Sequence, residues 1–350
     1  MFSILRPYIF SLDPETAHDL AIKSLKVNIL PKSFFKVEGE ELLEIKLFNK
    51  LLPNPIGLAA GFDKSAEVYN SLFKFGFGFI EVGTVTPKRQ LGNPKPRIFR
   101  LEKDKALINR LGFNNHGSEI IFKRISENQP DGFLGINIGP NKDTRNKEED
   151  YFTCLSRVSV DADYITINIS SPNTEGLRNF HNQEEMKKLL VGLNKIKKEK
   201  KIKLPIAIKI SPDIYEKDIE RIVELVKSQK IQGIIVSNTT DNNRENLSDM
   251  KKNEAGGLSG QPLKNLSTDL VKKFYKETKG EVKIIGVGGV DSGESAFEKI
   301  TAGADAVQLY TGMVYKGPGI VKEIKKELIS ILKKENLKNI GEAVGINAWP

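Results

Sequence analysis

The stretch Asp163-Tyr-Ile-Thr-Ile-Asn-Ile-Ser-Ser-Pro-Asn-Thr-Glu-Gly-Leu-Arg178 joins a strand pattern to an abrupt polar turn, and this junction decides the fold. Residues 164–169 are mostly β-branched or aromatic, contain no glycine or proline, and predict a buried strand. The run Ser171-Pro172-Asn173 cannot continue that strand, because proline removes a backbone donor and restricts the residue before it. Polar groups therefore gather where the strand ends, from Asn168, Ser170, Ser171 and Asn173. They predict either a ligand site or an Asx or Ser turn that caps the next helix.

Seven further stretches have the character of residues 164–169, and helical patterns lie between them. The eight predicted strands are residues 55–60, 79–85, 134–138, 164–169, 206–210, 233–237, 283–287 and 306–309. The predicted helices are residues 65–75, 116–127, 150–158, 183–200, 215–227, 267–278, 293–302 and 319–334. Eight short strands that alternate with helices predict an α/β fold, a (β/α)8 TIM barrel. An open doubly wound sheet is the alternative, although no Gly-x-Gly-x-x-Gly follows the first strand.

The two ends of the chain lie outside this alternation. Residues 1–40 predict an amino-terminal helical extension, residues 41–335 the barrel, and residues 336–350 a carboxyl-terminal tail. In the extension, Asp13 is a good helix N-cap, with Pro14 at the first helical position. The many apolar residues of the extension predict one of two arrangements. It is either a helical pair packed on the barrel, or a flap that lies on a membrane or guards an apolar tunnel.

Two internal segments also interrupt the alternation. Residues 88–113 contain Pro94, Pro96 and two alternating apolar runs, and they predict a β-hairpin inserted over the barrel mouth. Residues 239–262 are polar and rich in glycine, and they predict a long mobile loop after the sixth strand.

The composition disfavours several classes of protein. The chain is 39% apolar and 28% charged, as in ordinary globular proteins, and no apolar run reaches the roughly 18–20 residues that span a bilayer. Its net charge of +9 comes largely from lysines at helical spacing without interleaved aromatic residues, which argues against nucleic-acid binding. A basic surface would favour an anionic membrane. The single cysteine excludes an internal disulfide, and the three scattered histidines predict no metal site.

The carboxyl ends of the predicted strands carry amides, hydroxyls, lysines and glycines, with few carboxylates and no histidine. Since the chemistry of these barrels lies at those ends, the pattern predicts a site for a planar ligand rich in C=O and N–H groups. Glycines after the seventh strand and Thr311-Gly312 after the eighth predict a phosphate-bearing cofactor. Lys64 and Lys209 reach the same mouth. A cation there could stabilise electron density in a flavin or substrate, form a Schiff base, or be paired in a salt bridge.

The ordered motifs of the chain resemble those of dihydroorotate dehydrogenase, in its membrane-associated and quinone-dependent class. The matching motifs are Asn54-Pro-Ile-Gly-Leu-Ala-Ala-Gly-Phe-Asp-Lys64, Glu81-Val-Gly-Thr-Val-Thr86, Gly92-Asn-Pro-Lys-Pro-Arg97, Asn109-Arg-Leu-Gly-Phe113, Asn168-Ile-Ser-Ser-Pro-Asn-Thr174, Ser237-Asn-Thr-Thr240, Gly256-Gly-Leu-Ser-Gly-Gln-Pro262 and Gly286-Val-Gly-Gly289. The resemblance implies oxidation of dihydroorotate to orotate in pyrimidine biosynthesis, with FMN reduced by hydride transfer and reoxidised by a membrane quinone.

The resemblance also implies the residues of the site. FMN is expected to contact Ala60, Gly61, Thr84, Asn137, Asn168, Lys209, Ser237, Gly260, Gly289, Tyr310 and Thr311. Dihydroorotate is expected to contact Lys64, Asn109, Arg110, Leu111, Gly112, Phe113, Asn168, Asn173, Asn238 and Thr239. The asparagines suit a ring edge that alternates C=O and N–H groups, and Lys64 suits a carboxylate.

Ser171 occupies the position of the family's catalytic base. The soluble classes carry cysteine there and lack the amino-terminal helices, so the resemblance implies the quinone class. In that class the helices form the quinone tunnel. The implied mechanism is removal of a proton from C5 of dihydroorotate by Ser171 while a hydride leaves C6 for FMN N5. The expected location is peripheral, on the cytoplasmic face of a bacterial cell membrane.

Three other functions remain as alternatives. Another FMN barrel that reduces a pyrimidine, such as a tRNA dihydrouridine synthase, would carry a cysteine acid and an RNA-binding appendage. A Schiff-base aldolase that uses Lys209 would lack a flavin spectrum. A non-enzymatic basic protein that binds RNA or membranes would need no mouth lined by asparagine.

Overall fold

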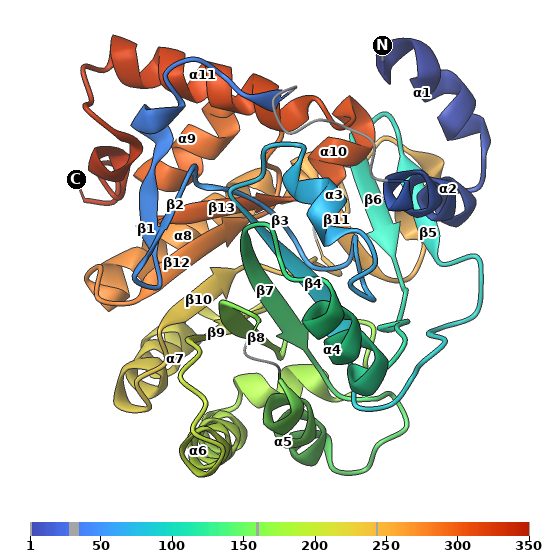
Figure 1. Ribbon diagram of the computed structural model, residues 1–350, viewed down its shortest axis with the longest axis vertical. Coiled ribbons are helices and arrows are strands. Elements are labelled where there is room, and N and C mark those ends of the chain that lie inside the picture. The colour runs from blue at the N-terminus through green and yellow to red at the C-terminus, as the bar shows by residue number, and fades with distance from the viewer. Residues whose placement is uncertain (1, 28–34, 159–160, 243, 350) are drawn as a thin grey trace.

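The chain folds around a closed barrel of eight parallel strands. The computed structural model describes residues 2–27, 35–158, 161–242 and 244–349. The strands follow the order β10-β12-β13-β3-β4-β7-β8-β9, and β9 pairs with β10 to close the ring (Figure 1). They are β3 (Ile56–Leu58), β4 (Phe79–Val85), β7 (Phe133–Ile138), β8 (Tyr164–Asn168), β9 (Ile206–Lys209), β10 (Gly233–Val236), β12 (Lys283–Val287) and β13 (Ala306–Leu309). The eight predicted strands and the TIM barrel are therefore confirmed, and closure excludes the open sheet.

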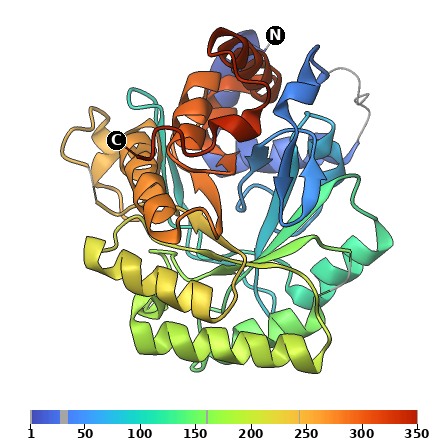
Figure 2. The same cartoon turned by 90° about the vertical axis from the view of Figure 1, so that its left-hand side faces the viewer.

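Helices surround the barrel on its outer side (Figure 2). They are α3 (Tyr69–Phe73), α4 (Ser118–Glu127), α5 (Lys147–Arg157), α6 (Gln183–Glu199), α7 (Glu216–Ser228), α8 (Lys264–Thr278), α9 (Gly293–Thr301), α10 (Thr311–Lys316) and α11 (Ile320–Lys334). Short 3-10 turns are η2 (Glu40–Leu43), η3 (Leu177–His181), η4 (Met250–Asn253), η5 (Gln261–Leu263) and η6 (Ile340–Ala343).

The predicted helix over residues 65–75 is wrong in its first half, since α3 begins only at Tyr69. The carboxylate of Asp63 accepts the backbone N–H groups of Glu67 and Val68, each at 2.7 Å. This side-chain turn holds the backbone in an irregular path, in which Ala66 has a φ of +52°. A local side-chain acceptor has displaced the helical hydrogen bonds.

Aromatic rings fill the inside of the barrel where neighbouring strands carry glycine. A Cβ atom at Gly135 would lie 2.2 Å from the ring of Tyr164, and one at Gly57 would lie 2.3 Å from the ring of Phe79. The ring of Phe48 lies 5.3 Å from that of Tyr164 and closes the amino-terminal end of the barrel. Phe48 comes from a hairpin of β1 (Ile45–Leu47) and β2 (Lys50–Leu52), which is absent from the predicted elements.

The predicted hairpin in residues 88–113 is confirmed as β5 (Ile98–Leu101) and β6 (Ala106–Asn109). The predicted long loop over residues 239–262 is wrong in part, because it contains β11 (Gly257–Gly260). β11 pairs antiparallel with β6, from Gly257 opposite Asn109 to Gly260 opposite Ala106. The three strands form a small sheet in the order β11-β6-β5, which we call the mouth sheet. Its backbone hydrogen bonds tie two loops distant in sequence together above the barrel.

The amino-terminal extension contains α1 (Phe2–Ser11) and α2 (Pro14–Lys26), which lie beside β5 and β6 (Figure 1). The predicted N-cap is confirmed, since Asp13 accepts the N–H groups of Glu15 and Thr16 at 3.0 Å each. Glu15 forms a 2.6 Å ion pair with the buried Arg97, which fixes α2 to the barrel. No helix in the described ranges is long and apolar enough to cross a membrane.

The predicted carboxyl-terminal tail is folded onto α9. Ile340 and Ala343 of η6 are fully buried, and the N–H of Gly345 donates to the carbonyl of Ile300 at 3.1 Å. The domain boundaries predicted at residues 40 and 335 stay a prediction. Residues 28–34 of the extension and Pro350 of the tail lie outside the described residues.

One carboxylate, Glu81 on β4, organises the polar core of the barrel. It is fully buried and accepts hydrogen bonds from Asn137, Tyr164, Thr166 and Gln308, at 2.8, 2.9, 3.0 and 3.1 Å. These four donors come from three other strands. A buried carboxylate that accepts several hydrogen bonds is satisfied, whereas each donor would be costly to leave unpaired.

Replacement of Glu81 by leucine is expected to lower the free energy of unfolding by on the order of 3 kcal/mol, because it leaves several buried donors without an acceptor. Urea unfolding followed by circular dichroism measures this change. Glu81→Gln is the matched control, because it keeps one acceptor oxygen and the same shape, and it is expected to cost less. Equal midpoints for the two variants would contradict this role of the carboxylate.

Candidate active site

A cavity of about 1310 Å³, its open mouth included, lies at the carboxyl ends of the barrel strands. The small sheet of β11, β6 and β5 contributes to its wall, through residues such as Leu107 and Ser259. Nineteen predicted site residues line it: Ala60, Gly61, Lys64, Thr84, Asn109, Leu111, Gly112, Phe113, Asn168, Ser171, Asn173, Lys209, Ser237, Asn238, Thr239, Gly260, Gly289, Tyr310 and Thr311. The fold therefore brings together, in one cavity, residues that are up to about 250 positions apart.

Two predicted site residues do not line this cavity. The side chain of Arg110 turns outward, where it forms a 2.8 Å ion pair with Glu254 and stacks 4.5 Å above the ring of Phe99. Asn137 lies one layer below the cavity, and its side-chain amide oxygen Oδ1 accepts the Thr84 hydroxyl at 2.6 Å. Asn137 therefore orients Thr84 but does not reach the cavity itself.

The cavity also contains polar residues that the predicted site does not include. Gln308 on β13 is fully buried, and its Oε1 atom has no hydrogen-bond partner among the described residues. The hydroxyls of Ser259 and Thr311 lie 2.9 Å apart. The signal for Gln308 is a glutamine inside the otherwise apolar strand Ala-Val-Gln-Leu. Ser259 carries no such signal, because β11 has no strand pattern.

Two lysines face the cavity from opposite sides of the barrel. Lys209 ends β9 and is 5% exposed, while Lys64 follows β3. Burial lowers the pKa of Lys209, although the charge of Glu81 opposes that effect. Burial likewise lowers the pKa of Lys64 to about 8, although the charge of Glu15 opposes it. Neither ammonium group has a hydrogen-bond or ion-pair partner among the described residues. Two unpaired cations make the cavity suited to anionic or electron-rich ligands.

The asparagines at the strand ends form a connected layer. Asn168 donates to the Thr84 hydroxyl at 3.0 Å and accepts the hydroxyl of Ser170 at 3.0 Å. Asn238 also donates to Ser170, at 2.9 Å. Ser170 thus serves the amide layer. Asx and Ser turns are present at Asn168 and Ser171, but neither caps the next helix, because the N-cap of η3 is Gly176 without a side-chain cap. The ligand site stays a prediction.

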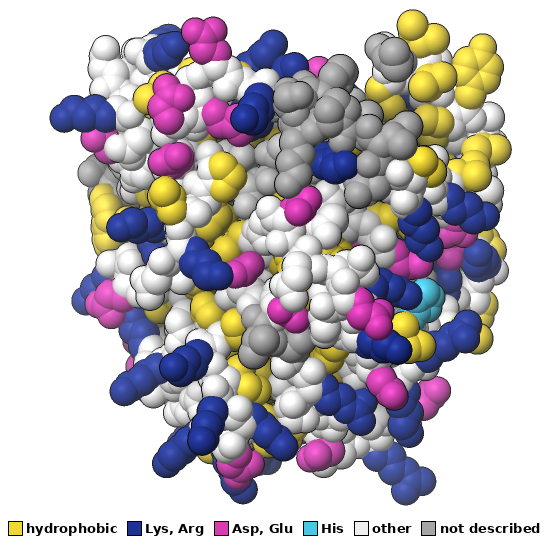
Figure 3. Space-filling view, viewed as in Figure 1, with side chains coloured by type: hydrophobic (Ala, Val, Ile, Leu, Met, Phe, Trp, Pro, Cys, Tyr) yellow, Lys and Arg dark blue, Asp and Glu magenta, His cyan; other side chains and the backbone are white. Residues whose placement is uncertain are grey.

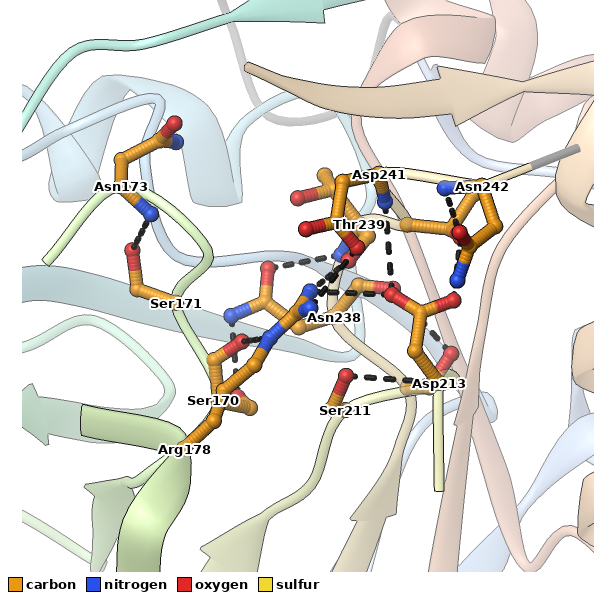
Figure 4. A network of polar contacts seen from close by, with 12 residues as sticks. Ser170, Ser171, Asn173, Arg178, Ser211, Asp213, Asn238, Thr239, Asp241 and Asn242 are labelled. Carbon is orange, nitrogen blue, oxygen red and sulfur yellow. Dashed lines mark hydrogen bonds and ion pairs between the residues drawn. The ribbon is translucent and has the colours of Figure 1, made fainter. Parts of the chain in front are cut away.

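Ser171 differs from Ser170 because it lines the cavity. Its Oγ accepts the backbone N–H of Asn173 at 3.2 Å, as Figure 4 shows. This bond fixes the hydroxyl rotamer and would stabilise negative charge that develops on Oγ. Asn173 in turn donates to the carbonyl of Asn109 at 3.1 Å, which joins the Ser171 loop to the mouth sheet.

A second cavity, of about 1270 Å³, lies between α1, α2 and the barrel. Its lining is mostly apolar and includes Phe10, Leu25 and Met313. The polar exceptions are His18, Ser24 and Arg100. Burial lowers the pKa of His18 to about 3, and the charge of Lys64 adds to the effect, so this imidazole is neutral at physiological pH. The two cavities share Ile98, Leu107 and Tyr310 as lining residues. The extension is packed on the barrel and also encloses an apolar cavity, and its role as a tunnel stays a prediction.

The first cavity is lined by two lysines, several amides, the hydroxyl of Ser171 and backbone of several glycines. No group of three or more possible metal-ligand side chains occurs in the described ranges. Cys154 is buried in α5, away from this lining. The arrangement can bind a planar polar ring and an anionic group, and it can remove a proton at Ser171.

Comparisons with known proteins agree with this geometry. A family model described as dihydroorotate dehydrogenase matches residues 42–332. The dihydroorotate dehydrogenase (quinone) of Bartonella tribocorum is 45% identical over 339 residues, which cover 96% of this chain and 93% of the relative. That of Bradyrhizobium diazoefficiens is 44% identical over 356 residues, which cover 98% and 97%. The structure of DHODH from Eimeria tenella in complex with ferulenol has a TM-score of 0.91 and 39% identity, and covers 97% of this chain and 96% of its own.

The barrel has the same architecture as these relatives, its mouth is lined by the residues of the matching motifs, and the family match covers most of the chain. The chain therefore belongs to the dihydroorotate dehydrogenase family.

Proposed function

We propose that this protein oxidises dihydroorotate to orotate in pyrimidine biosynthesis, with FMN as the bound electron acceptor and a membrane quinone as the final one. The observation that carries the proposal is a single cavity in which two unpaired lysines, a layer of asparagines and the hydroxyl of Ser171 converge. The rival pyrimidine reductase, aldolase and binding-protein functions have no comparable support.

The residues on the barrel side of the cavity fit a flavin mononucleotide. Lys209 offers an unpaired ammonium group, and Gln308 offers an unpaired buried acceptor, which match the electron-rich and N–H groups of a flavin edge. A Cβ at Gly289 would lie 2.4 Å from Lys264, and one at Gly260 would lie 2.4 Å from the Lys105 carbonyl. These close neighbours and the positive φ of both residues require glycine, and both glycines line the cavity, where their backbone would approach a phosphate. When bound, the flavin supplies the two-electron acceptor for the hydride from the substrate.

The remaining predicted contacts would hold the same cofactor along its length. Ala60, Gly61, Thr84, Asn168, Ser237, Tyr310 and Thr311 line the cavity beside Lys209 and Gly289. Asn137 would act at one remove, through the Thr84 hydroxyl.

Dihydroorotate would lie on the other side of the cavity, near Ser171. Lys64 would pair with its carboxylate, and the amides of Asn109, Asn173 and Asn238 would meet the alternating C=O and N–H groups of its ring. Leu111, Gly112, Phe113 and Thr239 would cover the ring and exclude water. Arg110 would contribute its backbone position only, because its side chain points to Glu254.

Ser171 would remove the proton from C5 as the hydride leaves C6. The hydroxyl of Ser171 would give up its own proton to water as its Oγ takes the proton from C5, and the electron pair of the broken C5–H bond would form the new ring double bond. The backbone N–H of Asn173 stabilises charge on Oγ during this step. The hydroxyl is an intrinsically weak base, so exclusion of water by the mouth sheet also contributes.

The second cavity suits an apolar quinone that enters from a lipid surface. It meets the first cavity at Ile98, Leu107 and Tyr310. On the outer side of α1, Ile4, Leu5 and Tyr8 are 72%, 50% and 74% exposed, and apolar side chains gather there at the upper right of Figure 3. Such a patch next to basic residues supports peripheral attachment to a membrane, and our proposal places it on the cytoplasmic face of the cell membrane.

Replacement of Ser171 by alanine is expected to slow flavin reduction by dihydroorotate about 10²–10⁴-fold, because the general base is lost. Stopped-flow absorbance under anaerobic conditions measures the rate, and the flavin spectrum checks that the cofactor is retained. Ser171→Cys is the matched control, because a thiol can accept the proton, and partial activity is expected. Flavin reduction at the parental rate in Ser171→Ala would refute the assignment.

The KM for dihydroorotate is expected to rise above about pH 8, where Lys64 of the free enzyme loses its proton and with it the attraction for the carboxylate. Below that pH the lysine is charged and KM should be flat, and kcat should change less than KM. Steady-state kinetics from pH 6.5 to 9.5 provide the test. Lys64→Arg keeps its charge throughout this range, so its KM should show no such rise.

Replacement of Ala21 by tryptophan is expected to raise the KM for quinone at least about tenfold, because Ala21 lines the apolar cavity and the larger side chain would fill it. The rate of flavin reduction by dihydroorotate should be unchanged, because Ala21 is remote from Ser171. Lys23→Trp on the exposed side of the same helix is the control. Equal quinone kinetics in the two variants would refute the tunnel.

A further inference from the structure

Arg178 lies outside the cavity but ends the loop that carries Ser171. The loop runs from β8 to η3, with Ser171 near its beginning and Arg178 in the first turn of η3. The side chain of Arg178 is 26% exposed, and its guanidinium group is surrounded by polar groups from three strand-end loops (Figure 4). None of the roles assigned above uses this residue.

The guanidinium group bridges two carboxylates from separate loops. It pairs with Asp213, which follows β9, at 3.0 Å and with Asp241, which follows β10, at 2.7 Å. It also points its N–H groups at the carbonyls of Ser170 and Thr239, each at 3.5 Å. The planar fork of arginine can serve four acceptors at once, which a lysine cannot.

Asp213 is the buried end of this bridge, with 8% of its side chain exposed. Besides Arg178, its carboxylate accepts the hydroxyl of Thr240 and the N–H of Asp241. Thr240 itself pairs with Leu258 of β11 through two backbone hydrogen bonds, of 3.1 and 2.6 Å. The bridge therefore connects the Ser171 loop to the mouth sheet as well as to the barrel.

The two carbonyls next to the guanidinium group belong to the site. Ser170 directly precedes Ser171, and its hydroxyl accepts Asn238 at 2.9 Å. Thr239 lines the cavity opposite, and its N–H donates to Asn238 at 2.8 Å. A movement of the Ser170 carbonyl away from Arg178 would shift Ser171 relative to the amide layer. Displacements of about 1 Å can cost on the order of 10²-fold in rate.

We propose that Arg178 is a positioning residue for Ser171, which holds the base at its working distance by tying the loops after β8, β9 and β10 together. The proposal rests on the proposed function, since it concerns the same proton transfer. It assigns a kinetic role to a residue that touches neither substrate nor cofactor.

The backbone around Arg178 has a second, independent anchor. His181 contacts the Arg178 carbonyl through Nδ1 at 2.9 Å, and its Nε2 accepts the N–H of Ser211 at 3.1 Å. Burial lowers the pKa of His181 to about 4, so the ring is neutral and Nδ1 carries the proton. Because this anchor uses the backbone of Arg178, it persists when the side chain is replaced, and η3 should stay folded.

The test uses the holoenzyme and compares the two half-reactions in Arg178→Met. Flavin reduction by dihydroorotate under anaerobic conditions should slow at least about tenfold at saturating substrate. Flavin content should be unchanged, and so should the oxidation by quinone of enzyme reduced with dithionite. Arg178→Lys keeps one charge and should recover part of the rate. Arg221→Met is the matched control, because Arg221 forms an exposed ion pair with Asp218 on α7 and its loss should change neither rate.

A double-mutant cycle distinguishes loss of the Arg178–Asp213 ion pair from a general loss of structure. If Arg178 acts through Asp213, then Arg178→Met and Asp213→Asn should each slow flavin reduction, and the double variant should be little slower than either. Should Arg178→Met lose its flavin, the comparison of Arg178→Lys with Asp213→Asn decides in its place, and unchanged rates in both overturn the proposal.

Two results would overturn this inference without touching the proposed function: parental flavin reduction in Arg178→Met, or additive effects in the cycle. An equal slowing of both half-reactions would also overturn it, because it would indicate a structural role. Failure of the parent enzyme to reduce its flavin with dihydroorotate would refute the proposed function instead.

Discussion

The cost of keeping two ammonium groups away from bulk water is the constraint on which this structure depends. Lys64 and Lys209 face one cavity, and the described residues offer them no partner. The charge of Glu81 partly offsets the cost of burying the Lys209 ammonium group. However, the Glu81 carboxylate already accepts four hydrogen bonds from other residues. An anionic or electron-rich ligand completes the balance. Because both lysines lack a partner within the protein, binding of such a ligand would stabilise the folded residues around the cavity.

The cavity at the carboxyl ends of the strands and the apolar cavity under α1 and α2 are separate, but they share three lining residues. Ile98 and Leu107 of the mouth sheet and Tyr310 after β13 belong to both linings. A polar substrate and an apolar quinone can therefore approach opposite sides of the same region without sharing a path. The amino-terminal helices line the apolar cavity, and the ion pair of Glu15 with Arg97 keeps them in place.

Most of the barrel could be predicted because its strands are short β-branched runs and its helices have clear apolar stripes. Of the 21 site residues that the family resemblance implied, 19 line one cavity, since parallel strands bring their carboxyl ends to one edge, and their contacts with a ligand stay a prediction. What could not be predicted depends on distant partners. β11 reads Gly-Leu-Ser-Gly and becomes a strand only because β6 pairs with it. Likewise, the start of α3 is set by the Asp63 carboxylate, and the outward turn of Arg110 by Glu254.

The pairing of β11 with β6 has a consequence for how the protein is made. Gly257 lies opposite Asn109, so the wall of the cavity joins segments separated in sequence by four of the eight barrel strands. On the ribosome, the hairpin of β5 and β6 emerges long before its third strand is synthesised, and its free edge has no neighbour meanwhile. Thr311 lies later still. The nascent chain therefore cannot form a complete pocket until nearly the whole polypeptide has been translated, and cofactor loading belongs to the finished protein.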